Sequence, residues 1–201
     1  RMSLPVANHR DAIIQIVRDN PVVIVSGETG SGKSTQVPQF LLEAVVEASA
    51  GGQLFCCQPR RISATSIAQR VATEWGDDRV GETVGYTVKL ETKMSARTRL
   101  VFCTTGILLR RLESDPMLHG ISHVIVDEVH ERSLDSDFLC VMLKRLLSER
   151  TDIRIVLMSA TVKESDFADY FGGAPIMTIP GRTFPVERLY LEDVIDRIEY
   201  T

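Results

Sequence analysis

The sequence predicts an α/β fold in which a doubly wound, mostly parallel sheet carries helices on both faces. Three observations lead to this prediction. Several short runs are almost continuously apolar, as strands buried on both faces require. Stretches with helical periodicity separate these runs, and a glycine-rich loop joins the first run to the helix that follows it. The apolar runs are residues 21–26, 53–58, 98–104, 122–127 and 154–159.

The segments between the runs have the apolar spacing of amphipathic helices. Pro38 lies inside one of them, and we expect a bend there because proline is tolerated only in the first helical turn. Ser63 is a plausible N-cap for another. The helical segments are residues 4–20, 33–48, 63–75, 135–150 and 164–171.

Two segments do not fit the regular alternation of strands and helices along the chain. Residues 84–95 alternate and are rich in β-branched side chains, which predicts an extra strand or hairpin outside the parallel sheet. Residues 174–191 contain three prolines and a glycine, which indicates edge strands or an exit segment. We therefore expect one domain over residues 1–180 and an exit segment over residues 181–201.

Composition narrows the functional classes. The chain has 201 residues, 44% of them hydrophobic, and a formal net charge of −4, which argues against a broad basic nucleic-acid face but permits a few placed contacts. The sequence has no run of about 18 apolar residues, which a membrane-spanning helix would need. Residues 1–11 lack the apolar core of a signal peptide. The four cysteines lack zinc spacing, so we expect core thiols in a reduced compartment, cytoplasmic or alternatively nuclear.

Residues 27–34, GETGSGKS, match the phosphate-binding pattern G-x-x-x-x-G-K-[ST] and lie between a predicted strand and a predicted helix. The glycines let backbone N–H groups point at phosphate oxygens, and the helix N-terminus adds positive potential. Lys33 would reach the β- and γ-phosphates, and Ser34 would offer a hydroxyl to Mg²⁺. The alternative, a glycine-rich turn with an exposed lysine, fits the flanking pattern poorly. The candidate nucleotide-binding residues are Gly27, Glu28, Thr29, Gly30, Ser31, Gly32, Lys33, Ser34 and Thr35.

Adjacent carboxylates follow another buried run. Asp127 ends residues 122–127, where a carboxylate would hold Mg²⁺ through water. Glu128 points differently and would orient or deprotonate the attacking water. The alternative is a solvated acidic turn, and a lone histidine such as His130 is more often structural. We take Lys33, Asp127, Glu128 and His130 as catalytic candidates, and Ser34, Asp127 and Glu128 as magnesium candidates.

These motifs form an ordered set that resembles the superfamily 2 helicases of the DEAH/DExH-box type, in the RNA helicase A-like group. The motifs are GETGSGKST (27–35), QPRRIS (58–63), TTGILLRRL (104–112), DEVH (127–130) and SAT (159–161). The DEVH spelling and residues 181–193 look similar to members linked to translation. The resemblance covers nearly the whole chain. It implies a RecA-like P-loop NTPase domain that uses ATP or another NTP with Mg²⁺ and binds RNA.

The resemblance also implies individual roles. Ser159, Ala160 and Thr161 would couple the nucleotide state to movement between two lobes, and His130 would hydrogen-bond toward this motif or toward the second lobe. The alternative for the SAT motif is a purely structural role, in which its hydroxyls cap the end of a strand. Arg70 matches a position where the family stacks an arginine on adenine, although it is also typical of an exposed helical arginine.

Further matches concern the nucleic acid. Arg60, Arg61 and Thr104 match RNA-backbone contacts, and Lys89 lies in a segment that resembles an RNA-touching hairpin. Many relatives have arginine where this chain has Lys89, and lysine keeps the charge but loses the bidentate fork. The alternative for all of them is solvated surface. Glu131 and Arg132 could form an ion pair that steadies the loop.

We find no second phosphate loop and no arginine-rich helicase motif after residue 161. We therefore expect the first lobe of a larger protein, with a second RecA-like lobe, accessory domains, RNA and possible ribosomal or ribonucleoprotein partners, and no membrane. Two other hypotheses stay open: a P-loop ATPase that is not a helicase, and a scaffold with a vestigial nucleotide site. Hydrolysis that RNA stimulates would distinguish a helicase from an ATPase that is not a helicase. Glu128→Gln should trap ATP in an enzyme and change nothing in a scaffold.

Overall fold

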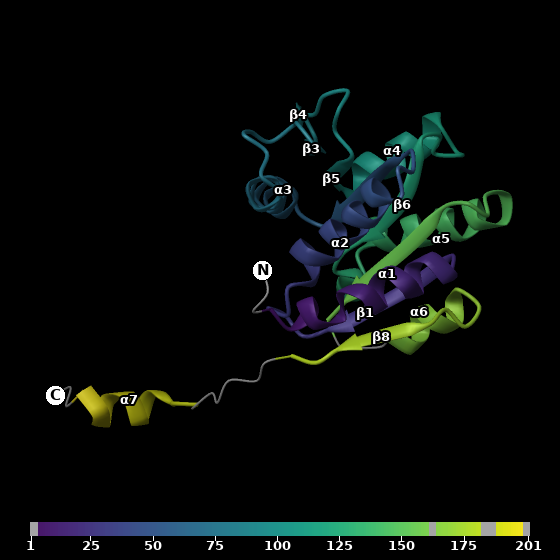
Figure 1. Cartoon of the computed structure of the whole chain (residues 1–201). Helices are drawn as coiled ribbons and strands as arrows, with labels where there is room; N and C mark the ends of the chain where they lie inside the picture. Colours follow the sequence, from purple (N-terminus) through teal and green to yellow (C-terminus); the bar gives the residue numbers. More distant parts are fainter. Residues whose placement is uncertain (1–3, 161–163, 182–187, 199–201) are drawn as a thin grey trace.

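The computed structural model of the chain describes residues 4–160, 164–181 and 188–198, and confirms the predicted α/β sheet. The strands form one sheet in the order β4-β3-β5-β2-β6-β7-β1-β8, and only β4 runs antiparallel to its neighbour. The strands are β1 (Val22–Gly27), β2 (Gln53–Gln58), β3 (Val84–Val88), β4 (Glu91–Lys93), β5 (Leu100–Thr104), β6 (Ile121–Val126), β7 (Arg154–Ser159) and β8 (Ile176–Ile179). Figure 1 shows the twisted sheet between its helices.

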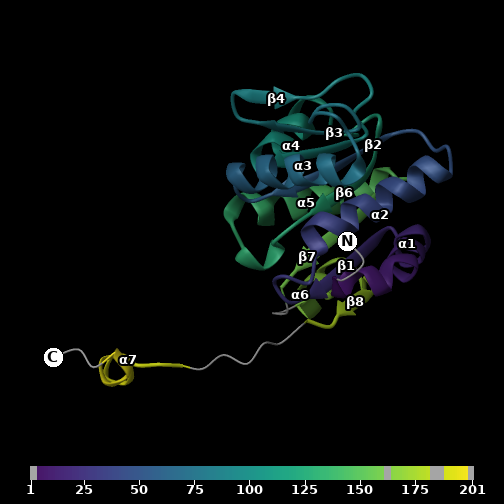
Figure 2. The same cartoon turned by 60° about the vertical axis from the view of Figure 1, so that its left-hand side comes forward.

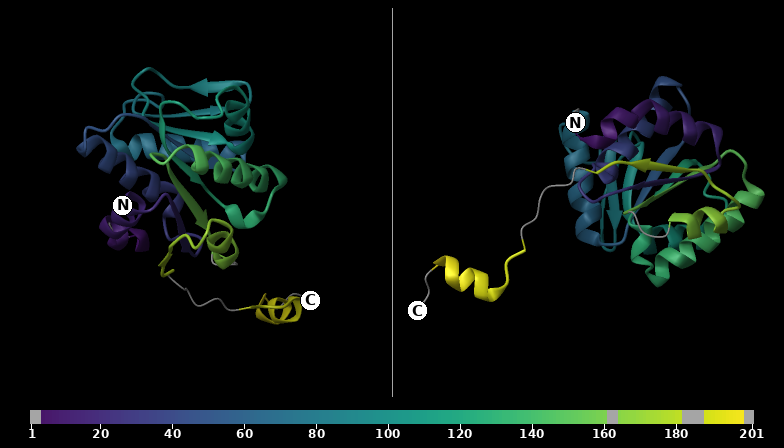
Figure 3. Two further views of the ribbon diagram at one scale, coloured as in Figure 1. Left: turned by 90° about the vertical axis from the view of Figure 1, so that its right-hand side faces the viewer. Right: turned by 90° about the horizontal axis from the view of Figure 1, so that it is seen from below.

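Helices cover both faces of this sheet, as Figures 2 and 3 show. One apolar core lies under α1, α2 and α3, and a second lies under α4, α5 and α6. The helices are α1 (Arg10–Asp19), α2 (Lys33–Glu47), α3 (Arg61–Trp75), α4 (Thr105–Ser114), α5 (Leu134–Glu149), α6 (Glu164–Tyr170) and α7 (Leu191–Ile198), with the short 3-10 helices η1 (Pro5–His9) and η2 (Val129–Glu131).

The central strands explain why the apolar runs are continuous. In β1, Val23 and Val25 face the first core, whereas Val22 and Ile24 face the second. A strand covered on both faces needs an apolar side chain at every position. The four cysteines are likewise buried and carry free thiols, as predicted.

Several predicted boundaries need correction. Residues 4–20 are not one helix, because the 3-10 helix η1 precedes α1 and its Val6 N–H donates to the Ser31 carbonyl of the glycine-rich loop. Ser63 is not an N-cap, since α3 begins at Arg61 directly after the extended residue Arg60. Pro38 needs no such correction, since it lies inside α2 as predicted, and the bend expected there stays a prediction.

The segment over residues 84–95 was predicted outside the parallel sheet, and this is wrong for its first strand. β3 pairs in parallel with β5, and only β4 turns back against it. α3 covers β3, so Val84, Tyr86 and Val88 join the first core despite the alternating pattern. At the other edge β8 pairs with β1, which confirms an edge strand in the proline-rich segment.

The C-terminal helix α7 lies apart from the sheet (Figure 1). Its apolar side chains Leu191 and Ile198 are exposed. None of the described helices has the length and apolarity needed to cross a lipid bilayer.

Candidate functional site

The carboxyl ends of the parallel strands lie along one edge of the sheet, and most candidate residues lie there. The RNA-contact candidates follow β3, β5 and β2, and the nucleotide candidates follow β6, β7 and β1. The two groups meet where β2 pairs with β6. In the order of the sheet the residues at or just beyond the strand ends are Lys89, Thr104, Arg60, Asp127, Ser159 and Gly27.

The glycine-rich loop connects β1 to α2 as predicted. Gly30 and Gly32 have φ angles of +84° and +95°, which side-chain-bearing residues rarely adopt. Gly27 faces β8 so closely that an added Cβ would lie 2.9 Å from the carbonyl oxygen of Ile179. The loop thus depends on glycine for its curl at two positions and for strand packing at a third.

Lys33 is the first residue of α2 and is buried. Its ammonium donates to the carbonyl oxygen of Gly27, to that of Glu28 at 3.0 Å and to the Ser31 hydroxyl at 3.3 Å. Burial lowers the pKa of Lys33, while the charges of Asp127 and Glu128 raise it. The Lys33 ammonium therefore lies inside the loop, and two carboxylates are close enough to raise its pKa.

Asp127 directly follows β6 and is 4% exposed. Its Oδ2 accepts a hydrogen bond from the Gln58 side chain at 2.8 Å, and its Oδ1 accepts one from the Glu128 N–H at 2.9 Å. The Ser34 hydroxyl also hydrogen-bonds this carboxylate. Burial raises the pKa of Asp127, and these hydrogen bonds together with the Lys33 charge counteract that rise. The carboxylate has a fixed orientation beside the start of α2.

Glu128 is the N-cap of η2 and has a φ of +55°, a left-handed conformation that costs a residue with a side chain about 1 kcal/mol or more. Its side chain is 35% exposed. Burial and the neighbouring Asp127 raise the pKa of Glu128. A carboxylate whose pKa is raised in this way is a stronger base than an ordinary surface glutamate.

His130 lies in η2 and faces the end of β7. Its Nδ1 accepts a hydrogen bond from the Ala160 N–H at 3.1 Å. Ser159, the last residue of β7, is fully buried. The predicted contact between His130 and the SAT motif is therefore present, whereas Thr161 lies outside the described residues.

The two arginines of the QPRR motif each pair with a carboxylate from another element. Arg60 pairs with Glu131 of η2 at 3.0 Å, and Arg61 pairs with Glu91 of β4 at 2.9 Å. The predicted pair between Glu131 and Arg132 is absent, because Arg132 instead contacts Asp137. The Arg60 pair connects the predicted RNA side of the edge to the DEVH segment.

The other candidates of this side also lie at the edge. Lys89 is exposed in the turn between β3 and β4, and Thr104 ends β5 and is the N-cap of α4. Because β3, β5 and β2 are parallel neighbours, a bound strand that crosses their carboxyl ends would pass all the predicted contacts.

Arg70 lies on α3 and reaches a pocket of about 210 Å³ at the glycine-rich loop. The site candidates that line this pocket include Gly30, Lys33, Ser34, Thr35, Arg70 and Glu128. Arg70 Nε also donates to Glu74 at 2.9 Å. The structure thus brings Arg70 to the phosphate loop even though the two are distant in sequence.

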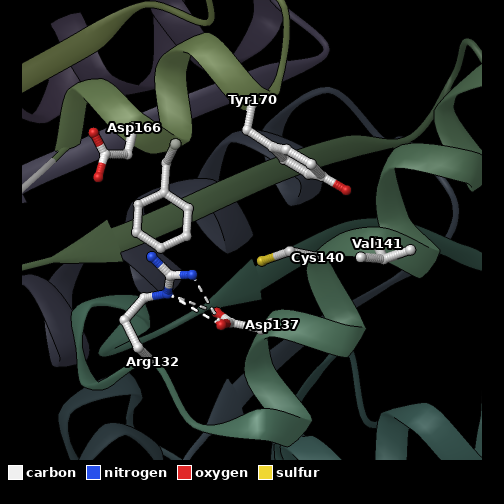
Figure 4. Close-up of a pocket in the computed structure, with 7 residues that line it drawn as sticks. Arg132, Asp137, Cys140, Val141, Asp166 and Tyr170 are labelled. Atoms are coloured by element: carbon white, nitrogen blue, oxygen red, sulfur yellow. Dashed lines mark hydrogen bonds and ion pairs between the residues drawn. The ribbon is translucent and has the colours of Figure 1, made fainter.

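A larger pocket, of about 280 Å³, lies between α5 and α6. Figure 4 shows Arg132 paired with Asp137 on one side and Tyr170 on the other. The Arg132 guanidinium lies 5.6 Å from the ring centre of Phe167. None of the predicted site residues lines this pocket, so we place the candidate site at the smaller one.

Sequence reasoning missed three contacts between side chains. Gln58 holds Asp127, Glu131 holds Arg60, and Glu74 holds Arg70. Only Gln58 carried a signal, because it is a polar residue at the end of a strand that is otherwise buried.

The oxygen donors at this site suit a metal ion that takes most of its ligands from a bound phosphate group and from water. Among the described residues no group of three or more histidine, cysteine, aspartate or glutamate side chains could form a metal cage. Ser34 and Asp127 instead supply a hydroxyl and a carboxylate oxygen side by side. This fits Mg²⁺, which binds through one or two protein oxygens, phosphate oxygens and water.

Comparison with known proteins places the same segment in one family. Residues 7–169 match the family model described as DEAD/DEAH box helicase. The chain is 50% identical over all its length to the DExH-box ATP-dependent RNA helicase DExH1 of Arabidopsis thaliana, of which it covers 20%. It is 51% identical to the putative ATP-dependent RNA helicase DHX57 of Homo sapiens, of which it covers 14%, and 98% of it is 50% identical to human DHX29, of which it covers 15%. The chain thus spans a fifth or less of each of these relatives.

Proposed function

Since the chain belongs to the DEAD/DEAH box helicase family, we propose that it is the nucleotide-hydrolysing lobe of an ATP-dependent RNA helicase. The observation that carries this proposal is the placement of Glu128 beside Asp127, in the pocket that also contains Lys33 and Ser34. A nucleoside triphosphate would lie with its phosphates on the loop N–H groups and on the Lys33 ammonium.

In this proposal each side chain has a distinct task. Lys33 compensates the charge of the β- and γ-phosphates, and Glu128 accepts the proton of the water that attacks the γ-phosphorus as the bond to the β-phosphate oxygen breaks. Ser34 and Asp127 would hold Mg²⁺, which supplies further charge compensation on the phosphates. Gln58 keeps the Asp127 carboxylate in place from the neighbouring strand.

RNA would bind beside this site through its sugar-phosphate backbone. The support is the row of Arg60, Arg61, Thr104 and Lys89 at the ends of neighbouring strands. Such contacts position a strand without reading its bases, so we expect little sequence preference. A second RecA-like lobe would complete both the nucleotide site and the RNA path, and ribonucleoprotein particles are candidate substrates of the whole protein.

The test is hydrolysis of MgATP by this chain, with and without single-stranded RNA. Because an arginine supplied by a second lobe commonly contributes about 10³–10⁵ in turnover, we expect slow hydrolysis. Lys33→Ala should abolish nucleotide binding, whereas Glu128→Gln should keep binding and abolish hydrolysis. Glu149→Gln, which removes an exposed carboxylate on α5, is the matched control. Hydrolysis that survives Glu128→Gln would contradict the proposal, and absence of RNA binding would favour an ATPase that is not a helicase.

A further inference from the structure

A buried polar cluster lies between α2 and α3, next to the phosphate loop. The side chains of Gln36 and Gln39, which are 1% and 0% exposed, donate to the same oxygen of Glu74, Oε2, at 2.8 Å and 2.9 Å. The other oxygen, Oε1, accepts from Arg70 Nε at 2.9 Å. One oxygen of the carboxylate is therefore anchored in the interior, and the other holds the guanidinium.

The same cluster contacts the first turn of α2. Gln39 Nε2 also donates to the Thr35 carbonyl at 2.8 Å, and Gln36 Nε2 lies 3.1 Å from Thr35 Oγ1. Thr35 Oγ1 in turn donates to the Gly32 carbonyl at 3.2 Å. The position of the Glu74 carboxylate is thus set by the helix that begins at the phosphate loop.

Arg70 differs for this reason from an ordinary surface arginine. Its side chain is 62% exposed, and a long exposed side chain samples many rotamers unless a partner selects one. Glu74 is 20% exposed and is held at three hydrogen bonds. Arg145 and Glu149 on α5 have the same i,i+4 spacing, but their atoms lie 3.8 Å apart and Glu149 is 51% exposed.

We propose that Glu74 is a positioning residue of the nucleotide site, whose carboxylate, anchored by Gln36 and Gln39, holds Arg70 toward the nucleoside part of a bound nucleoside triphosphate. This inference rests on the proposed function. The phosphates have their own contacts at the loop and Lys33. The Arg70 charge is partly compensated by Glu74, so its exposed planar face suits an aromatic base better than an anion.

The experiment compares two ligands on this 201-residue chain by calorimetry in Mg²⁺: ATP, and inorganic tripolyphosphate, which has the phosphates without the nucleoside. Glu74→Gln should weaken ATP binding about three- to tenfold, the range expected for losing one oriented arginine–aromatic contact, and leave tripolyphosphate binding unchanged. Arg70→Ala should cause a similar selective loss, and the double variant should be no weaker than Arg70→Ala alone. Glu149→Gln should change neither affinity.

Two further controls keep the inference testable. Glu74→Asp retains the charge, but its carboxylate is one methylene shorter and is withdrawn from Arg70, so it should reproduce the selective loss if Glu74→Gln unfolds the chain. Equal loss for both ligands, or additive losses in the double variant, would overturn the inference. If the wild-type chain binds both ligands and Glu74→Gln matches it, the inference alone is wrong. If the wild-type chain binds neither, the proposed function itself is wrong.

Discussion

The backbone N–H of Ala160 donates a hydrogen bond to Nδ1 of His130 across 3.1 Å, and so connects the end of β7 to η2. An imidazole nitrogen that accepts this hydrogen bond carries no proton, so in this arrangement the ring proton is on Nε2. Glu128 Oε2 lies 3.5 Å from the same Nδ1. An ion pair between the two side chains would require a proton on Nδ1 and the loss of the Ala160 hydrogen bond.

This contact gives the first prediction. His130→Leu should lower the free energy of unfolding by about 1 kcal/mol, because the Ala160 N–H loses its acceptor. His130→Asn should lose less, since its Oδ1 can occupy roughly the place of Nδ1 and accept the same bond. Urea unfolding of the two variants measures the difference. Equal losses would mean that the hydrogen bond contributes nothing to stability.

The left-handed backbone at Glu128 gives a second prediction. At a φ of +55° glycine is unstrained, so Glu128→Gly should be more stable than Glu128→Ala by about 1 kcal/mol. Both variants lack the carboxylate and should lose hydrolysis equally. Thermal unfolding and ATPase assays on this matched pair separate the two effects. A more stable alanine variant would show that the backbone at this position is not held left-handed in solution.

A third prediction concerns the paired arginines. Glu131 and Glu91 compete with RNA phosphates for Arg60 and Arg61, so Glu131→Gln and Glu91→Gln should each tighten binding of single-stranded RNA. Exposed pairs of this kind are weak, so we expect a modest gain in affinity, of about fivefold or less. Fluorescence anisotropy at low ionic strength measures it.

The control for this prediction is Glu149→Gln, which changes the net charge equally on α5. It should tighten RNA binding less, and the gains should shrink as salt screens the charges. An equal gain with Glu149→Gln would attribute the effect to net charge rather than to release of the arginines.

A fourth prediction concerns pH. Burial and the nearby charge of Arg154 lower the pKa of His123 from 6.5 to about 4. Between these values the unfolded chain binds more protons than the folded chain, so stability present above pH 6.5 is lost as the pH falls toward 4. Between pH 7 and pH 5 this amounts to about 2 kcal/mol.

His123→Gln should remove that component of the pH dependence. Urea unfolding of wild type and variant at pH 8, 7 and 5 compares the two proteins, and the difference between them cancels contributions from all other groups. The two should change in parallel from pH 8 to pH 7 and diverge at pH 5. Parallel curves down to pH 5 would contradict a His123 that stays neutral in the folded chain.

The sequence predicted the central strands and the phosphate loop because their signals are local. A strand covered on both faces is apolar at each position, and a loop that curls around phosphates needs glycine at fixed spacing. The alternating pattern of β3 was misleading, since a strand near the edge of the sheet can still be covered by a helix such as α3. The 3-10 form of η1 was missed because apolar spacing does not distinguish it from an α-helix over one turn.

The contacts between charged side chains could not be predicted from local sequence patterns. Glu131 and Arg60 are 71 residues apart, and they meet only because β6 lies beside β2 in the sheet. Gln36 and Glu74 meet only because α2 packs on α3. Strand order and helix packing decide such pairs, and a single sequence carries no direct record of either.

The segment that follows β2 has one further consequence. Gln58 holds the Asp127 carboxylate, Arg60 holds Glu131, and Pro59 lies between them. The proline ring fixes φ at about −65° and restricts the residue before it, so these three residues have few ways to move independently. The contact that orients Asp127 and the contact that holds Glu131 therefore lie two residues apart, on either side of a proline. A displacement of the backbone at Arg60 would have only this short, restricted segment between it and the side chain that orients Asp127.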